Sequence, residues 1–82
     1  MTYLVYILYS SSFDKYYIGQ TNEINKRLSR HNSGYVPSTA PYAPWELVLT
    51  LEKPSRSEAM VLEKKLKNLN RERLLKFIEK YG

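Results

Sequence analysis

The sequence contains no cysteine and one histidine among its 82 residues. Without cysteine, the chain cannot form disulfide bonds, catalyse through a thiolate or build a cysteine zinc site. A single histidine, His31, cannot supply a metal site that needs several imidazole ligands. The fold therefore has to be stable without covalent cross-links.

Long hydrophobic runs are also missing. The longest apolar stretch, Leu4–Tyr9, is far too short to cross a bilayer. It lies near the N-terminus but has neither a positive leader nor a small-residue cleavage site, so it does not resemble a signal peptide. We therefore expect a soluble cytoplasmic protein and no membrane partner. With 43% hydrophobic residues, the chain has the composition of one globular domain spanning residues 1–82.

Positive charge and tyrosine are abundant. The net charge is +5, and the segment Arg56–Lys76 holds seven Lys or Arg against three Glu. An excess of positive charge favours a polyanionic partner. The eight tyrosines suit half-buried sheet faces, and they equally suit a surface that stacks on bases. Nucleic acid is the partner we expect.

Three segments carry strand patterns. Tyr3–Ser10 is apolar on both alternating faces, which predicts a central strand. Lys15–Gln20 predicts a second strand, paired antiparallel with the first through a short hairpin. Trp45–Glu52 alternates apolar and polar residues and predicts a third strand with one face more exposed. Its predicted apolar face consists of Trp45, Leu47, Leu49 and Leu51. We expect Trp45 to pack in the core rather than to stack on a base.

The first helix pattern is short and basic. It covers Asn22–Asn32, with Thr21 or Asn22 as the predicted N-cap and Gly34 as the stop. The next segment, Tyr35–Pro44, holds three of the four prolines and predicts an irregular loop.

Two more helix patterns follow the third strand. Ser55–Glu58 fits a capping box, and the apolar residues after it recur at three and four. Asn70 can cap a last amphipathic helix with the stripe Leu74–Tyr81. The order strand, strand, helix, strand, helix, helix predicts an α+β fold. It has a three-stranded, mostly antiparallel sheet with helices packed around it.

A set of spaced polar and aromatic residues runs through these elements. The set is Tyr6, Tyr17-Ile18-Gly19, Arg27, His31-Asn32, Pro44-Trp45, Glu58-Ala59 and Glu63. It resembles the GIY-YIG nuclease family, in particular its small single-domain branch, over nearly the whole chain. The first half-motif reads Leu4-Val5-Tyr6, so its tyrosine is kept and its glycine is not. Gln20 and Leu75 stand where several family members have lysine and asparagine.

The resemblance implies that the hydroxyls of Tyr6 and Tyr17 face the scissile phosphate and that one of them acts on the attacking water. Which tyrosine is the base stays open, and packing in the sheet is the alternative for both. Free tyrosine titrates near pH 10. A base at neutral pH therefore needs help from a nearby cation or from a metal-bound water.

Arg27 and His31 lie four residues apart and share a helical face. The resemblance makes Arg27 the catalytic arginine, which would stabilise charge on the phosphate in the transition state. His31 could accept a proton, orient a tyrosine hydroxyl or contact phosphate. A solvated surface histidine with no role has equal weight.

The remaining candidates concern metal and substrate. The resemblance places the metal ligand at Glu63, where one carboxylate with water and substrate oxygens suits one Mg²⁺ or Mn²⁺ ion. An ion pair with Lys64 or Lys67 is the alternative for Glu63. Gly19 either permits a bulge or positive φ at the strand end, or lets the phosphate approach closely. The resemblance matches Thr39 to a hydroxyl residue of the small branch and so makes it a candidate phosphate contact. The ammonium groups of Lys64 and Lys67 are further candidates.

The sequence thus predicts a divalent-metal-dependent endonuclease that hydrolyses DNA phosphodiester bonds by tyrosine-assisted attack of water. The alternative is a nucleic-acid-binding module of the same fold with little or no catalysis. A protein-interaction domain that uses the stripe Leu74–Tyr81 is a third reading. DNA against RNA stays open, as does whether a protein partner or a homodimer supplies specificity.

Overall fold

The three strands form one antiparallel sheet in the order β2-β1-β3. The computed structural model describes residues 2–81. Its elements in chain order are β1 (Tyr3–Ser10), β2 (Lys15–Thr21), α1 (Ile24–Ser33), the 3₁₀ helix η1 (Ala40–Tyr42), β3 (Glu46–Lys53), α2 (Arg56–Lys67) and α3 (Arg71–Tyr81). This architecture confirms the predicted α+β class and the predicted order of elements. No helix within residues 2–81 has the length and apolar character needed to span a membrane.

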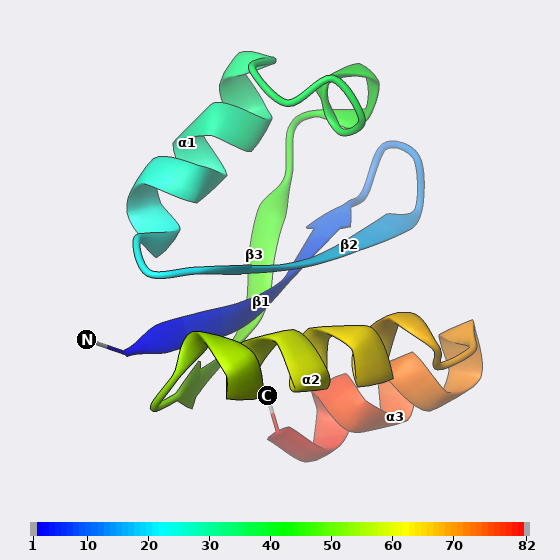
Figure 1. Cartoon of the computed structure of the whole chain (residues 1–82). Helices are drawn as coiled ribbons and strands as arrows, with labels where there is room; N and C mark the ends of the chain where they lie inside the picture. Colours follow the sequence, from blue (N-terminus) through cyan, green and yellow to red (C-terminus); the bar gives the residue numbers. More distant parts are fainter. Residues whose placement is uncertain (1, 82) are drawn as a thin grey trace.

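The central strand β1 is covered on both faces, as its continuous apolar sequence predicts. Val5, Tyr6, Ile7 and Leu8 are all at most 1% exposed. Figure 1 shows α1 and the loop that follows it on one side of the sheet, with α2 and α3 on the other. Each face of β1 therefore belongs to a separate hydrophobic core.

The two cores divide the apolar residues by sheet face. The core beneath α2 and α3 contains the buried residues Val5, Ile7, Ile18, Leu49, Ala59, Leu66 and Leu74. The core beneath α1 contains Tyr6, Leu8 and Trp45, with Tyr17, Ile24, Leu28, Tyr42 and Ala43 packed against them. Leu74, Phe77 and Ile78 of α3 pack against the first core, which accounts for the apolar stripe of that helix.

Strand β3 differs from its predicted alternation. The register shifts between Ile7 and Leu8, so that Ile7 pairs with Leu49 but Leu8 pairs with Leu47. Val48 is thus an extra residue in a β-bulge, and a bulge reverses the side-chain alternation. Leu47 is 41% exposed whereas Leu49 is 7% exposed, so the prediction that they share a buried face is wrong. The strand begins at Glu46, and Trp45 before it is buried in the second core, as expected for packing.

The helix ends follow local capping chemistry. Helix α1 starts later than predicted: Glu23 is its N-cap, and Thr21 Oγ1 accepts a hydrogen bond from Glu23 N–H, so the predicted cap at Thr21 or Asn22 is wrong. Gly34 ends α1 with φ 83°, the left-handed conformation that glycine adopts without strain. The predicted caps of α2 and α3 are confirmed. Ser55 Oγ accepts from Glu58 N–H at 3.3 Å, and Asn70 Oδ1 accepts from Arg73 N–H at 2.9 Å.

Candidate active site

A cavity of about 410 Å³ opens beside the edge strand β2, and residues from β1, β2, α1 and α2 line it. Five of the predicted site residues are among them: Tyr6, Tyr17, Gly19, Arg27 and Glu63. They span 58 positions of the sequence and come from four elements. The fold therefore gathers most of the predicted site in one place.

The β1–β2 register determines the relative positions of the two tyrosines. Tyr6 pairs with Gly19, and Leu8 pairs with Tyr17, so Tyr6 and Tyr17 are diagonal neighbours on one sheet face. Their ring centroids lie 6.2 Å apart. Tyr6 is fully buried, whereas Tyr17 is half-buried. The two rings line the same cavity as Arg27, as the sequence predicts.

Gly19 makes room for the ring of Tyr6. A Cβ atom at residue 19 would lie 2.5 Å from Tyr6 Oη and 2.6 Å from Tyr6 Cζ, closer than real side-chain contacts. The β1–β2 register runs through Gly19 without a break, and the positive φ values belong to Asp14 and Gly34. The predicted bulge or positive φ at Gly19 is therefore wrong. The prediction that phosphate approaches Gly19 closely is also wrong for the side on which a Cβ atom would lie, because the Tyr6 ring fills that space.

A buried chain of hydrogen bonds runs behind the tyrosines. Tyr6 Oη lies 3.0 Å from His31 Nε2, and His31 Nδ1 lies 2.8 Å from Thr39 Oγ1. The Thr39 hydroxyl donates its proton to the Val36 carbonyl oxygen. Thr39 Oγ1 therefore accepts from His31 Nδ1–H, which leaves Nε2 as the acceptor for the Tyr6 hydroxyl. The chain thus fixes both the tautomer of His31 and the direction of the Tyr6 O–H bond.

This arrangement corrects the predictions for two residues, His31 and Thr39. His31 is 0% exposed and Thr39 is 2% exposed. Unlike Tyr6, neither side chain lines the cavity, so a phosphate contact by Thr39 is wrong, as are the phosphate-contact and solvated-surface interpretations of His31. Burial lowers the pKa of His31, and the charge of Arg27 lowers it further. A neutral imidazole that orients Tyr6 is the arrangement that fits these contacts.

Asn32 holds the loop that carries Thr39. Its side-chain oxygen accepts from Trp45 N–H at 2.5 Å, and its Nδ2 donates to the Trp45 carbonyl oxygen at 3.1 Å. The indole Nε1–H of Trp45 donates to the Thr39 carbonyl oxygen at 3.0 Å. The adjacent residues His31 and Asn32 therefore fasten the 34–45 segment to α1. This explains physically why the two residues occur together in the motif.

Arg27 is half-buried and lines the same cavity as the two tyrosines. Burial raises the pKa of the Tyr6 hydroxyl, Arg27 beside it opposes this change, and Tyr17 and Glu63 raise the pKa further. Contact with Tyr6 is the main cause of the raised pKa of Arg27. The Nε atom of Arg27 is buried without a hydrogen-bond partner. A buried donor of this kind is well suited to an anionic ligand.

Glu63 extends from α2 to the cavity wall. Its side chain is 22% exposed, and Lys67 Nζ lies 3.9 Å from its Oε2 atom, at the outer limit of an ion pair. Lys64 and Lys67 do not line the cavity, although Lys67 contacts Glu63, which does. Within residues 2–81 there is no cluster of three or more His, Asp or Glu. A single carboxylate beside two phenolic oxygens in an open cavity fits a hydrated Mg²⁺ or Mn²⁺ ion, which keeps several water ligands.

Comparison with known proteins agrees with this geometry. The family model described as the GIY-YIG catalytic domain matches residues 2–76. The chain belongs to the GIY-YIG family. The UPF0213 protein BH0048 of Halalkalibacterium halodurans is 36% identical over 72 residues, which cover 87% of this chain and 76% of that protein. The solution NMR structure of the UPF0213 protein BH0048 from Bacillus halodurans matches with a TM-score of 0.66 and 32% identity, covering 100% of this chain and 87% of that one.

Membership of the GIY-YIG family gives the site a general chemistry, because GIY-YIG domains are nuclease catalytic domains that act on nucleic acid. Five other residues on the cavity wall were not predicted as site residues: Tyr3, Gln20, Thr21, Asn22 and Arg56. Arg56 stands seven residues before Glu63 on α2, which is two helical turns on the same face. Once Glu63 was a candidate, this spacing on a predicted helix could have identified Arg56 as a second site residue.

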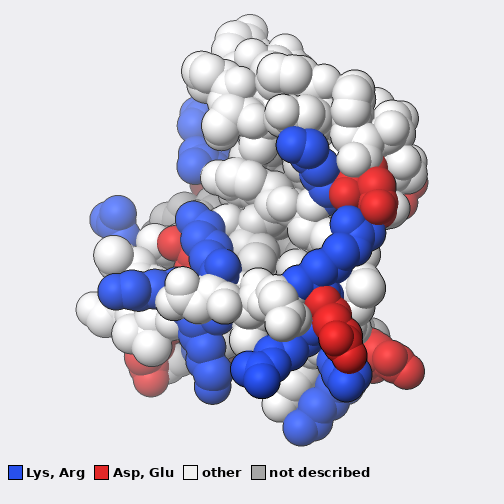
Figure 2. Space-filling model, turned by 90° about the vertical axis from the view of Figure 1, so that its right-hand side faces the viewer, with Lys and Arg blue, Asp and Glu red and all other residues white. Residues whose placement is uncertain are grey.

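The positive charge of the GIY-YIG domain is not one continuous patch. Figure 2 shows Lys and Arg mixed with Asp and Glu over the half of the molecule that α2 and α3 form, and few charges on the half above it. Several of these charges form ion pairs, among them Lys76 with Glu72 and Arg71 with Asp14. Within the cavity, Arg27 and Arg56 come from helices on opposite faces of the sheet. The two arginines therefore bring positive charge to the cavity from two sides.

Proposed function

We propose that this chain is a divalent-metal-dependent endonuclease that hydrolyses DNA phosphodiester bonds by tyrosine-assisted attack of water. The observation that carries the proposal is the single cavity lined by Tyr6, Tyr17, Arg27 and Glu63. The GIY-YIG catalytic-domain match supports nuclease chemistry at that cavity. The net charge of +5 supports a polyanionic substrate.

The hydrogen-bond direction at Tyr6 supports Tyr6 as the general base. The Tyr6 hydroxyl donates to His31 Nε2, so its oxygen has lone pairs to accept a proton from the attacking water. As water transfers that proton to Tyr6, the phenolic proton moves to His31 Nε2, while Nδ1–H remains on His31 and hydrogen-bonded to Thr39 Oγ1, so His31 becomes an imidazolium. No free phenolate accumulates. The raised pKa of Tyr6 and the lowered pKa of His31 both oppose this relay, and the negative charge of a phosphate in the cavity offsets part of that cost because it favours a cation nearby.

The other residues act on the phosphate. The Arg27 guanidinium lines the cavity, where it binds the non-bridging oxygens and stabilises their growing charge. Tyr17 borders the same space and orients the attacking water. Glu63 would hold the divalent ion, which when bound stabilises negative charge on the leaving oxygen.

The overall reaction forms one bond from the water oxygen to phosphorus and breaks the bond from phosphorus to the 3′ oxygen. The leaving oxygen takes a proton from solvent. The products are a 5′-phosphate and a 3′-hydroxyl, as the GIY-YIG resemblance implies.

A cleavage assay on single strands, duplexes, flaps and junctions, with Mg²⁺, Mn²⁺ or EDTA, tests this proposal. We expect cleavage that needs a divalent ion and leaves ligatable 5′-phosphate ends. The Tyr6→Phe variant, checked for folding by circular dichroism, should lose that cleavage. Tight binding of these substrates without cleavage in any metal would overturn the nuclease proposal and favour the binding-module alternative.

A further inference from the structure

A second cavity, of about 440 Å³, lies along α1 beyond the candidate active site. Arg27, Arg30, Tyr35 and Val36 line it. Arg27 also lines the active-site cavity, so the two cavities meet at this one side chain. A strand whose phosphate lies on Arg27 would therefore extend directly into the second cavity.

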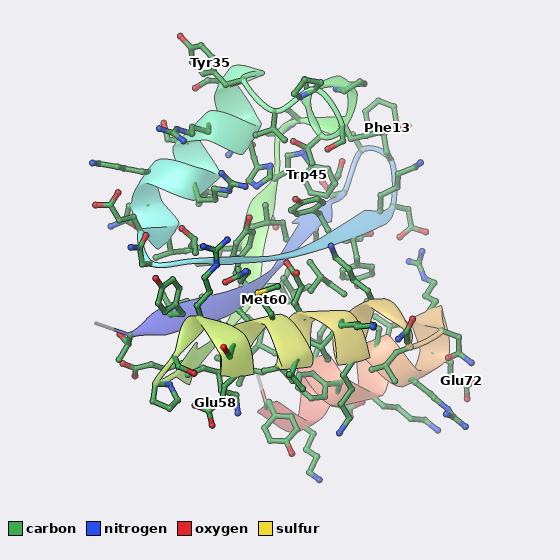
Figure 3. The ribbon with its side chains drawn as sticks, in the orientation of Figure 1. Phe13, Tyr35, Trp45, Glu58, Met60 and Glu72 are labelled. Carbon is green, nitrogen blue, oxygen red and sulfur yellow. The ribbon has the colours of Figure 1, made fainter. Side chains whose placement is uncertain are left out.

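Tyr35 is exposed to an extent that packing does not explain. Its side chain is 80% exposed, the highest value among the large exposed hydrophobic residues of the described chain. Figure 3 shows it projecting from the end of α1, away from the rest of the molecule. Its backbone is nonetheless fixed, because Tyr35 N–H donates to the Arg30 carbonyl oxygen at 3.1 Å directly after the left-handed Gly34. The fold thus fixes the backbone from which this exposed aromatic ring projects.

The charges around Tyr35 favour a nucleic-acid strand. Arg27 and Arg30 are three residues apart on α1, so their side chains lie on neighbouring parts of one face. Cations that follow a backbone, combined with an aromatic ring for a base, are the usual elements of a single-strand binding surface. Tyr35 lies two residues beyond Ser33, the last residue of α1, so it stands at the C-terminal end of the helix that carries both arginines.

We propose that Tyr35 and Arg30 form a subsite that stacks an unpaired base close to the scissile phosphate. The subsite rests on the proposed function for its substrate class, nucleic acid, and for the place of the phosphate at Arg27. A base inside a duplex is already stacked on both faces and paired at its edge, so an exposed ring captures only an unpaired base. The preferred substrate is therefore a single strand, or a duplex that is unpaired beside the cut.

The test compares four proteins: the unmodified chain and the variants Tyr35→Ala, Tyr35→Phe and Tyr81→Ala. Tyr81 is a matched control, because it is a 51% exposed tyrosine on α3, across the sheet from α1. Binding to a single-stranded oligonucleotide and to the matching blunt duplex is measured in EDTA at fixed salt. Fluorescence of 2-aminopurine placed along the single strand reports stacking.

We expect Tyr35→Ala to weaken single-strand binding about 5- to 100-fold, the range for loss of one stacked base, and to leave duplex binding unchanged. Tyr35→Phe should stay within about 2-fold of the unmodified chain because its ring still stacks. Tyr81→Ala should change neither single-strand binding nor duplex binding. An equal loss on single strand and duplex, or no loss at all, overturns the subsite.

Cleavage of the same oligonucleotides with Mg²⁺ or Mn²⁺ separates the two proposals. If the Tyr35→Ala variant cleaves and still prefers single strands to duplexes, the result supports the nuclease and overturns the subsite. Tyr35-dependent single-strand binding without cleavage supports the subsite and overturns the nuclease. Absence of binding to every nucleic acid overturns both.

Discussion

The ring of Tyr6 lies across Gly19 on the neighbouring strand, so close that a Cβ atom at residue 19 would sit 2.5 Å from the Tyr6 hydroxyl oxygen. Tyr6 cannot easily move away, because it is fully buried and its hydroxyl is hydrogen-bonded to His31. The glycine of the second half-motif and the tyrosine of the first are therefore one steric unit.

Gly19→Ala should displace the Tyr6 hydroxyl. We expect a loss of stability of about 1–3 kcal/mol from overpacking. Turnover should fall about 10²-fold or more, since a shift of about 1 Å at a catalytic group has that effect. Urea denaturation and a cleavage assay measure the two losses. In a Tyr6→Leu background the added Cβ should cost much less stability, and fully additive losses would contradict the steric link.

The two tyrosines should respond differently to loss of the hydroxyl. Tyr6→Phe leaves His31 Nε2 buried without its donor, which should destabilise the fold by about 1–3 kcal/mol. It should also reduce turnover by about 10²- to 10⁴-fold, the usual contribution of a general base. Tyr17→Phe should change stability less, because Tyr17 is half-buried. Undiminished turnover in folded Tyr6→Phe would assign the base elsewhere.

Stability should fall with acidification through His31. Burial and Arg27 hold the pKa of this imidazole below its usual value, so the folded state favours the neutral form. As pH falls through about 6.5, the unfolded chain takes up a proton that the folded chain resists, and stability decreases. Above that pH the contribution is fully present. Denaturation between pH 8 and pH 5 measures it, with His31→Gln as the control that should show a flatter profile. Identical profiles for both proteins would contradict the buried neutral imidazole.

Arg27→Lys should separate catalysis from binding. A guanidinium bridges two phosphoryl oxygens, whereas an ammonium is a point charge. We expect most DNA affinity to remain and turnover to fall by about 10²- to 10³-fold, as for loss of one preorganised donor. Equilibrium binding in EDTA and single-turnover cleavage measure the two quantities. Parallel loss of both would mean that Arg27 only holds the substrate.

The elements of the fold could be predicted from sequence because each has a local pattern. Tyr3–Ser10 is apolar on both faces and is central, and Ser55 and Asn70 cap the helices that follow them. The bulge at Val48 could not be predicted, since it depends on how β3 pairs with β1. Alternation within a single strand does not contain that information.

The sequence predicted which residues form the candidate site better than it predicted the contacts that they make. Tyr6, Arg27 and Glu63 follow from the motif and line one cavity. The burial of His31 did not follow, because a polar residue on a short basic helix is usually solvated. Only the 34–45 loop, which Asn32 fastens over the imidazole, removes His31 from water.

The most direct test of the account is metal-dependent cleavage by Glu63→Gln, compared with Glu72→Gln. Both variants remove one negative charge, but Glu72 lies on α3 and pairs with Lys76 outside the cavity. Single-turnover cleavage over a Mg²⁺ or Mn²⁺ titration is measured beside DNA binding in EDTA. We predict that Glu63→Gln loses cleavage at every metal concentration while DNA affinity stays equal or rises slightly, and that Glu72→Gln cleaves normally. Undiminished cleavage by Glu63→Gln would contradict the proposed metal site and the mechanism built on it.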